Sequence, residues 1–516
     1  MFHGKNLIFY VLLIPVIGIL AIIPTKRDEN VKYIALNFSS FAFVISLLIW
    51  ALFDKNTGSF QFISNNIWVS YLNLNCALGV DGISLFFLLL TTLLFPLCIV
   101  LSWSKTNSIK NYFLAFLVLE FFLIGAFCSI ELFMFYIFFE SVLIPMFLII
   151  GVWGSRERKI KASYYFFLYT LFGSILMLLS IIYAQVQLGT TNYEVLLTFS
   201  FSEIEQKLIW FSFFVSFASK VPSLPVHLWL PEAHVEAPTA GSIILAGVLL
   251  KLGTYGFIRF SLPMLPKASF YFAPLIYCVC VISLIYTSFT AIRQTDFKRI
   301  IAYTSIAHMN LVVLGIFSFN TIGTEGAVLQ CLSHGFVASA LFLIIGIFYD
   351  RHHTKIIKYY GGLVHVMPVC IIFFCFFTLA NLGLPGTSNF VGEFLVLAGL
   401  FKISNNIGVF GSASMVLSGC YSLWLFNRIS YGNIKTQYCK KMLDINKREF
   451  VTLLPLTLFT LFIGINPNIF LASIHMSVNK LIELVYFYYD LCFKNSTTSK
   501  QICFYCIVLY LWYRCE

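Results

Sequence analysis

Long apolar stretches separated by short polar segments dominate the hydrophobic pattern of this chain. A helix needs about 20 apolar residues to cross the hydrocarbon core of a bilayer. Fourteen stretches approach or reach that length, at 6–24, 32–53, 79–103, 111–130, 131–153, 162–188, 207–221, 240–260, 269–292, 300–318, 326–349, 365–385, 407–430 and 449–473. The pattern predicts an all-α polytopic membrane protein with about fourteen transmembrane helices.

One segment departs from this helical pattern. Residues 54–78 alternate apolar and polar side chains and are rich in aromatic and β-branched types, which predicts a short β-hairpin at the outer membrane interface. Asp81 follows and leads into the third apolar stretch. We expect Asp81 to cap the N-terminus of that helix, and not to take part in chemistry.

Positive charges alternate between the loops. They follow the first, third, fifth, ninth, eleventh and thirteenth stretches, where they include Lys26, Arg27, Lys32, Lys105, Lys110, Arg156, Arg158, Lys159, Lys161, Arg293, Lys298, Arg299, Arg351, Lys355, Lys358, Arg428, Lys435, Lys440, Lys441, Lys447 and Arg448. The positive-inside rule then places these loops on one side, the cytoplasm or its organellar equivalent, with the N-terminus opposite. The loop after the seventh stretch carries Glu232, His234 and Glu236 without a cation, so we expect it to fold back into the protein.

Two lysines lie inside apolar sequence on either side of a proline-rich segment. Lys220 ends the seventh stretch and Lys251 lies well inside the eighth. A lysine at the centre of a bilayer costs about 2.5–3.5 kcal/mol on insertion scales, so its presence indicates function. Pro222, Pro225, Pro231 and Pro238 lie between the two and remove backbone donors, which predicts an interrupted helix. Irregular backbone at membrane depth requires burial in protein or a watery cavity.

Carboxylic acids also occur in the apolar stretches. Glu120 lies in the fourth and Glu140 in the fifth, where Glu131 stands nine residues earlier, on the opposite helix face and near the membrane edge. An acid kept neutral by burial is one interpretation of Glu140. The other is a partner for the intramembrane lysines, because burial brings the proton affinities of a carboxylate and an amine closer together.

A second interruption occurs in the sequence ANLGLPGTSNFVGEF, which contains Gly383, Pro385 and Gly386 and is followed by Glu393 in resumed apolar sequence. Broken helices at corresponding places in two halves are typical of inverted-repeat transporters. We therefore predict two inverted repeats, formed by spans 4–8 and 9–13, with Lys220 and Glu393 in comparable places.

Four histidines, His227, His234, His308 and His334, lie in or beside the predicted spans. A histidine that titrates near neutral pH is suited to proton relay. Two bis-histidine haem sites, as in a membrane cytochrome, are an alternative, but His227 and His234 fall in the proline-broken segment and no CxxCH motif is present. For any single histidine, a hydrogen-bonded core position remains open.

Composition supports a membrane protein. Hydrophobic residues make up 59% of the 516 positions and charged residues 11%, which excludes an ordinary soluble domain. The net charge of +11 lies in loops between spans, so it indicates topology and not nucleic-acid binding. The fourteen cysteines lie mostly in apolar stretches, without metal-ligand spacing, and are expected to be free thiols. The abundance of Phe, Ile, Tyr, Asn and Lys is typical of an AT-rich organellar or reduced bacterial genome.

Several segments together resemble the antiporter-like membrane subunits of proton-pumping NADH:ubiquinone oxidoreductase, respiratory complex I. They are FFESVLIPMFLIIGVWG, KASYYFFLYTLFGS, VPSLPVHLWLPEAHVEAPTAGS, IAYTSIAHMN, LGLPGTSNFVGEF and YSLWLFNRISYG, within residues 75–435. Subunits of multisubunit sodium/proton antiporters share the wider family and are the alternative. The resemblance implies a membrane-arm subunit of the mitochondrial inner membrane, or of a bacterial plasma membrane, with sibling antiporter-like subunits and lipid as partners. It also implies that the chain has no cofactor of its own, with NADH, FMN, iron–sulfur clusters and ubiquinone bound by partner subunits.

The resemblance further implies roles for individual residues. Glu140 and Lys220 would form a coupled acid–base pair, Lys251 the central relay and Glu393 the way to the far exit. His308 and His334 would support a hydrated axis, with His227 and His234 nearby in the first interruption. The implied organisation is 1–110 for the N-terminal spans and hairpin, 111–265 and 266–435 for the two repeats, and 436–516 for the last span and a C-terminal extension. Residues 485–516 of that extension exceed the expected family pattern, as a peripheral hairpin or a partner contact.

Overall fold

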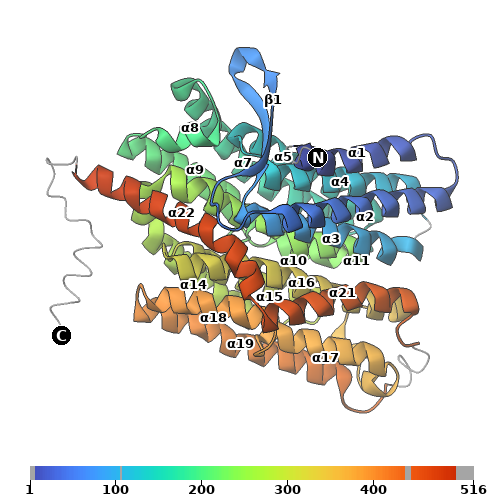
Figure 1. The fold of residues 1–516 in the computed structure, drawn as a ribbon. Coiled ribbons are helices and arrows are strands. Elements are labelled where there is room, and N and C mark those ends of the chain that lie inside the picture. The colour runs from blue at the N-terminus through green and yellow to red at the C-terminus, as the bar shows by residue number, and fades with distance from the viewer. Residues whose placement is uncertain (1–5, 105–106, 436–442, 495–516) are drawn as a thin grey trace.

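The computed structural model describes residues 6–104, 107–435 and 443–494, with the side chains of 488–494 excepted. Its helices lie roughly along one direction and pack side by side (Figure 1). Within this part of the chain, twelve helices are long and apolar enough to cross a membrane. Three shorter apolar helices, Leu7–Ile22, Pro368–Leu382 and Ser388–Phe401, accompany them. The predicted all-α polytopic fold is confirmed.

The helices follow one another with few irregular connections. They are α1 (Leu7–Ile22), α2 (Asp28–Leu52), α3 (Gly82–Leu101), α4 (Ile109–Cys128), α5 (Leu132–Ser141), α6 (Leu143–Trp153), α7 (Lys159–Leu188), α8 (Tyr193–Thr198), α9 (Glu203–Lys220), α10 (Trp229–Glu236), α11 (Thr239–Ile244), α12 (Leu250–Gly256), α13 (Leu262–Met264), α14 (Pro266–Ile292), α15 (Phe297–Ile316), α16 (Thr321–His352), α17 (Pro368–Leu382), α18 (Ser388–Phe401), α19 (Asn405–Ser430), α21 (Lys447–Ile465) and α22 (Asn468–Lys494).

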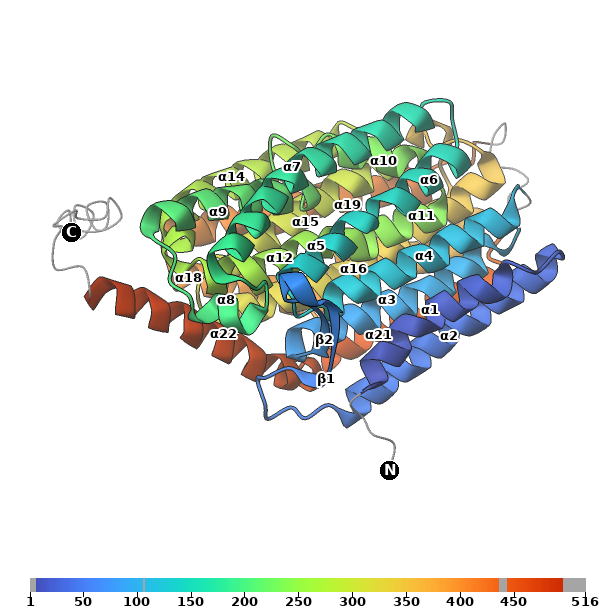
Figure 2. The same ribbon diagram turned by 90° about the horizontal axis from the view of Figure 1, so that it is seen from above.

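The predicted last span, 449–473, is wrong as a single helix. Helix α21 ends at Ile465 and α22 begins at Asn468. Pro467 stands between them and disfavours helical backbone at the residue before it, so the chain turns there. Helix α22 then runs obliquely along the outside of the bundle (Figure 2). Residues 485–494 of the predicted extension continue this helix, and residues 495–516 lie outside the described residues.

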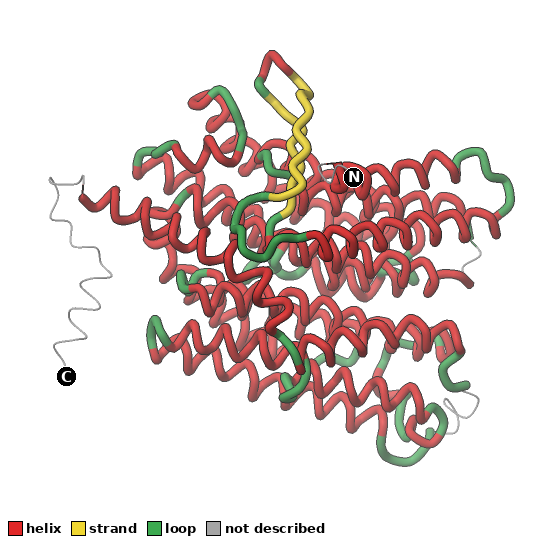
Figure 3. Tube along the Cα trace, in the orientation of Figure 1, coloured by secondary structure: helices red, strands yellow, loops and turns green. Residues whose placement is uncertain are grey.

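The predicted hairpin is confirmed. Strands β1 (Gln61–Val69) and β2 (Leu74–Val80) pair antiparallel, with Ser64 opposite Leu78 and Asn66 opposite Cys76. The hairpin projects from the helices as a separate ribbon (Figure 3). Directly after it, Asp81 Oδ1 accepts a 2.9 Å hydrogen bond from the Ser84 backbone N–H and caps α3, as predicted.

The cationic loops gather at one end of the molecule, on the right in Figure 1. Contacts connect them in series: Lys110 Nζ donates to the Ile23 carbonyl, Trp153 Nε1 to Asn107, Lys355 Nζ to Ser155, the Ile357 N–H to Thr295 and Arg351 to Asp444. For the described residues the expectation that these loops share one side is confirmed; Lys105, Lys440 and Lys441 lie outside them. We call this side the cationic end. The hairpin lies at the opposite end, where the Ile130 N–H donates to the Ala77 carbonyl.

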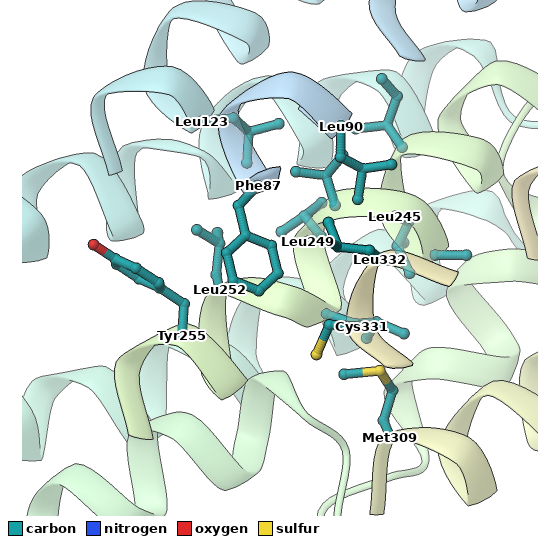
Figure 4. Packing of buried hydrophobic residues seen from close by; sticks show 14 of the residues in the cluster. Phe87, Leu90, Leu123, Leu245, Leu249, Leu252, Tyr255, Met309, Cys331 and Leu332 are labelled. Atoms are coloured by element: carbon teal, nitrogen blue, oxygen red, sulfur yellow. The ribbon is translucent and has the colours of Figure 1, made fainter. Parts of the chain in front are cut away.

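A helix that is buried except for its first residue, Thr239, forms the centre of the fold. It consists of α11, α12 and α13, joined by two π-helical turns, Leu245–Leu249 and Phe257–Ser261. Leu245, Leu249 and Leu252 lie among residues of α3 and α4 and beside Cys331 and Leu332 of α16 (Figure 4). Every residue of α12 is buried, so any polar side chain on it must find its partner inside the protein.

Candidate functional site

Glu140 stands where the fifth span is distorted. Helix α5 ends at Ser141 and α6 begins at Leu143. Pro145 explains the break, because it lacks an N–H and its ring collides with the carbonyl four residues earlier, that of Ser141. The half-buried Glu140 side chain is hydrogen-bonded to Ser174 of α7.

Lys220 is the last residue of α9, and its side chain contacts Phe139, the residue directly before Glu140. The Lys220 Nζ donates to the Phe139 carbonyl at 3.3 Å and lies 4.4 Å from the centre of the Phe139 ring. Glu140 and Lys220 interact electrostatically. Among the described residues no ion pair of 4.0 Å or less joins them, so the two residues are neighbours without direct contact, and their acid–base role stays a prediction.

Lys251 is held at the centre by the π-helical turn that precedes it. Such a turn shifts the backbone bonding pattern by one residue, and it leaves the Ala246 carbonyl to accept from the Lys251 Nζ. The same Nζ lies 2.9 Å from His334 Nδ1 on α16. Helix α9 approaches closely here, since a Cβ built on Gly253 would lie 3.2 Å from the Lys220 Cβ.

Contacts continue from His334 to the second repeat. The His334 and His308 rings are 5.8 Å apart between centres. His308 Nδ1 lies 3.1 Å from Glu393 Oε1, which also accepts a 3.2 Å hydrogen bond from Gln330 Nε2. All four side chains are buried. We call Lys251, His334, His308 and Glu393 the polar axis, with Glu140 and Lys220 adjoining its Lys251 end.

Both predicted helix interruptions are present. The first separates α9 from α10, directly after Lys220. The second separates α17 from α18, where Gly383 (φ +84°) and Gly386 (φ +91°) adopt the left-handed conformation that glycine tolerates. Lys220 ends the half-helix before its break, whereas Glu393 lies in the half-helix after its break.

The two histidines of the first interruption differ in position. His234 is buried, stacks on Phe342 with ring centres 4.4 Å apart, and interacts electrostatically with Lys251 and Lys298. His227 lies beside Tyr286 and Tyr303, with ring centres 6.0 and 6.4 Å away. The structure therefore brings His234 toward the polar axis, whereas it places His227 against the two tyrosines.

The end of α10 is held by a buried lysine at the cationic end. Lys355 Nζ donates to the Val235 carbonyl and to Ser155 Oγ. Burial lowers the pKa of Lys355 to about 8, and Glu236 opposes that shift. The charge of this link therefore changes in the slightly alkaline range.

Sequence reasoning missed two polar residues, Gln330 and Arg259. Gln330 donates to Glu393 and stands four residues before His334, so the two polar residues share one helix face within an apolar stretch, a signal that could have identified Gln330. Arg259 pairs with Asp81 at 2.5 Å and is surrounded by Phe60, Tyr193 and Tyr255. Its place inside an apolar stretch was the same signal that identified Lys251.

Glu120 is not part of the polar axis. It is fully buried in α4, and neither carboxyl oxygen has a hydrogen-bond partner among the described residues. Within the same residues, no group of three or more His, Cys, Asp or Glu side chains is arranged to hold a metal ion.

The chain is similar to proteins of known kind. A family model described as NADH:quinone oxidoreductase/Mrp antiporter, TM, matches residues 129–418. The "NADH-ubiquinone oxidoreductase chain 4" of Marchantia polymorpha is 53% identical over 475 residues, covering 92% of this chain and 96% of the relative. The "NADH-quinone oxidoreductase subunit M" of Rhodobacter capsulatus is 45% identical over 469 residues, covering 88% and 91%.

Two solved structures share the fold. A chain of respiratory complex I from Thermus thermophilus with bound NADH superimposes with a TM-score of 0.85 at 27% identity, covering 93% of this chain and 99% of that chain. A chain of the Mrp complex from Dietzia superimposes with a TM-score of 0.81 at 17% identity, covering 94% and 100%. At the latter identity the likeness concerns the fold alone.

Proposed function

Because this chain belongs to the antiporter-like membrane subunits of NADH:ubiquinone oxidoreductase, of the chain 4 or subunit M type, we propose that its polar axis is a path for protons. The chain is a proton-translocating subunit of the membrane arm and a multi-pass protein of the mitochondrial inner membrane. The proposal assigns that translocation to Glu140, Lys220, Lys251, His334, His308 and Glu393. His234 lies beside the path.

The observation that carries the proposal is the pair of contacts at the two ends of the axis. Lys251 Nζ lies 2.9 Å from His334 Nδ1, and His308 Nδ1 lies 3.1 Å from Glu393 Oε1. Each contact joins two titratable groups at hydrogen-bond distance, which is the geometry that proton transfer needs. The 5.8 Å between the two histidine rings is a step that a single water can bridge.

A change in the charges of Glu140 and Lys220 can drive proton movement along the polar axis. When Glu140 is ionised, it favours a protonated Lys220, and moving the two apart favours release of that proton toward Lys251. The transmembrane potential opposes each transferred charge by about 2.3 kcal/mol per 100 mV. A change of one unit in the pKa of a carrier is worth about 1.4 kcal/mol, so a change of a few units is sufficient.

Electron transfer is assigned to other subunits. We infer that NADH, FMN, the iron–sulfur clusters and ubiquinone bind to partner chains, and that sibling antiporter-like subunits lie next to this one. Membership of the oxidoreductase family supports both inferences. A subunit of a sodium/proton antiporter is less well supported, because the Mrp chain shares the fold at only 17% identity.

Substitution of Lys251 tests the proposal. Lys251→Arg keeps the positive charge but cannot release a proton, whereas Lys251→Ala removes both. If Lys251 carries protons, both variants should lower NADH-driven proton translocation in proteoliposomes by about 100-fold. If Lys251 is only a structural cation, the arginine variant should pump normally, and that result would refute the proposal. Lys161→Ala, which alters an exposed lysine of α7, is the matched control and is expected to pump normally.

A further inference from the structure

A polar cavity of about 480 Å³ opens at the cationic end, away from the polar axis. The ends of α3 and α16 and the beginnings of α11 and α21 surround it, and its lining includes Ser102, Ser104, Thr239, Asp350, Arg448 and Glu449. A cavity of this size and polarity has room for many water molecules.

The charges in the cavity balance one another. Arg351 donates to Glu449 through two bonds of 2.6 and 3.1 Å and also to three backbone carbonyls, so its position is fixed. With Asp350 and Arg448 the lining carries two acids and two cations. This balance does not favour an anionic ligand such as a lipid phosphate. Asp350 is exposed, and so it is free to exchange protons with the water of the cavity.

Titratable groups lead inward from this cavity. Asp350 interacts electrostatically with Lys298, whose side chain is buried. The Lys298 Nζ donates to the Ala237 carbonyl at 2.8 Å and to Ser242 Oγ at 3.4 Å. Ser242 in turn donates to the His234 carbonyl, and the His234 ring interacts electrostatically with both Lys298 and Lys251.

We propose that this cavity is the inlet through which protons from the cationic side reach the polar axis, with Asp350 as the outer carrier and Lys298 and His234 as the inner ones. The inference rests on the proposed function of Lys251. It adds a second branch, because this route reaches Lys251 from α15 and α16 without passing Glu140 and Lys220. His234, which adjoins the polar axis without belonging to it, receives a role in this arrangement.

Variants of Asp350 in the assembled complex test the inlet. Asp350→Asn cannot carry a proton and is expected to lower NADH-driven proton translocation by about 10-fold, less than a fully essential carrier, because cavity water supplies some protons in its place. Asp350→Glu keeps the titratable group and should restore most of the rate. Glu157→Gln changes an exposed acid of the same end, outside the cavity, and should have no effect.

Blocking the cavity supplies an independent measurement. Ser104→Cys places a thiol at an exposed position of the lining, and labelling it with a bulky maleimide should slow proton translocation while the complex stays assembled. Glu157→Cys, labelled in the same way, should pump normally. The unsubstituted chain is labelled in parallel, because Cys278 and Cys420 are exposed.

The outcomes distinguish failure of the inlet proposal from failure of the proposal that the polar axis carries protons. Normal pumping by Asp350→Asn and by labelled Ser104→Cys, together with loss of pumping in Lys251→Arg, would refute the inlet and leave the polar axis intact. Normal pumping by Lys251→Arg would refute the path on which the inlet depends. Equal losses in Asp350→Asn and Asp350→Glu would also overturn the proposal, since a carrier role requires rescue by the second acid.

Discussion

Lys251 shows how a membrane protein tolerates a buried amine. Its Nζ reaches the Ala246 carbonyl and His334 Nδ1, so two acceptors replace the water that the ammonium group loses. Glu393 is treated similarly, with His308 and Gln330 at its Oε1. Each group is therefore fixed in position beside a histidine at hydrogen-bond distance, which is the arrangement that a proton carrier needs.

Glu140 and Lys220 are expected to act as one unit. Glu140→Gln keeps a hydrogen-bonding partner for Ser174 but cannot stabilise a charged Lys220, so NADH-driven pumping should fall by at least about 10-fold. Lys220→Ala should cause a similar loss, and the double variant should lose little more, because interacting groups are not additive. Proton uptake by proteoliposomes measures this, and normal pumping by a fully assembled Glu140→Gln complex would favour a neutral structural acid.

Glu393 is expected to tolerate a change in the sign of its charge. A terminal carrier needs a titratable group on a flexible stem, which lysine also supplies. Glu393→Lys should therefore keep substantial pumping, whereas Glu393→Gln and Glu393→Ala should lose most of it.

The contacts of Glu393 make this a demanding test. If Glu393 were the fixed ion-pair partner of a protonated His308, the lysine variant would place two positive charges side by side, at a cost of several kcal/mol. Pumping and assembly are measured for all three variants. The carrier role is wrong if the lysine variant is the poorest of them.

At the scale of elements, irregular helix geometry places the proposed carriers. A π-helical turn precedes Lys251, a proline-induced break follows Glu140, and Lys220 and Glu393 adjoin the two interrupted helices. Each irregularity leaves backbone carbonyls without their usual helical donors. In a bilayer these groups need partners inside the protein, and polar side chains supply them.

Close packing between α9 and α12 should be required for transfer. A Cβ on Gly256 would lie 2.3 Å from the Phe217 ring, a distance that forces the ring to move. Phe217 packs on Phe139, whose carbonyl binds Lys220. Gly256→Ala should therefore destabilise the subunit by about 1–3 kcal/mol and impair pumping.

A helical glycine with more space provides the control. Gly419 in α19 has only the tip of Leu382 near its added Cβ, at 3.2 Å, so Gly419→Ala should change neither property. Thermal inactivation of the complex and proton translocation are measured for both variants. Wild-type values for Gly256→Ala would contradict the packing argument.

At the scale of the whole molecule, charge and length set the orientation. Helix α16 has 32 residues, about 48 Å at 1.5 Å per residue, which exceeds the hydrocarbon thickness of about 30 Å. Its C-terminal end carries Arg351 in the cationic end, and its N-terminal end carries Glu325, which contacts His475 at 2.6 Å. The two ends of this helix must therefore face different compartments.

Cysteine labelling should show this orientation. Arg158→Cys, in the cationic end, should react with an impermeant maleimide only from the matrix side, as the positive-inside rule requires. Ile322→Cys, at the start of α16, should react only from the other side. Labelling of both positions from the same face would contradict the topology.

Much of this organisation follows from the sequence by itself. The apolar stretches, the alternation of cationic loops, the hairpin, the Asp81 cap and both helix interruptions were all predictable. They depend on local properties, namely apolar length, charge, β-propensity and proline, and a bilayer enforces them because unpaired backbone groups are costly there. The same reasoning identified Lys220, Lys251, Glu140 and Glu393 as unusual residues.

Only the tertiary structure decided which of these residues meet. It joined Lys251 to His334 and His308 to Glu393, separated Glu140 from direct contact with Lys220, and set His227 apart from the axis. It also placed Gln330 against Glu393 and bound Lys298 to the Ala237 carbonyl. One predicted span is divided into α21 and α22. These contacts connect residues that are distant in the chain, and they depend on how helices rotate and approach at small residues such as Gly253. Apolar length and charge pattern show that a helix crosses the membrane, but its packing determines which of its faces meets which neighbour.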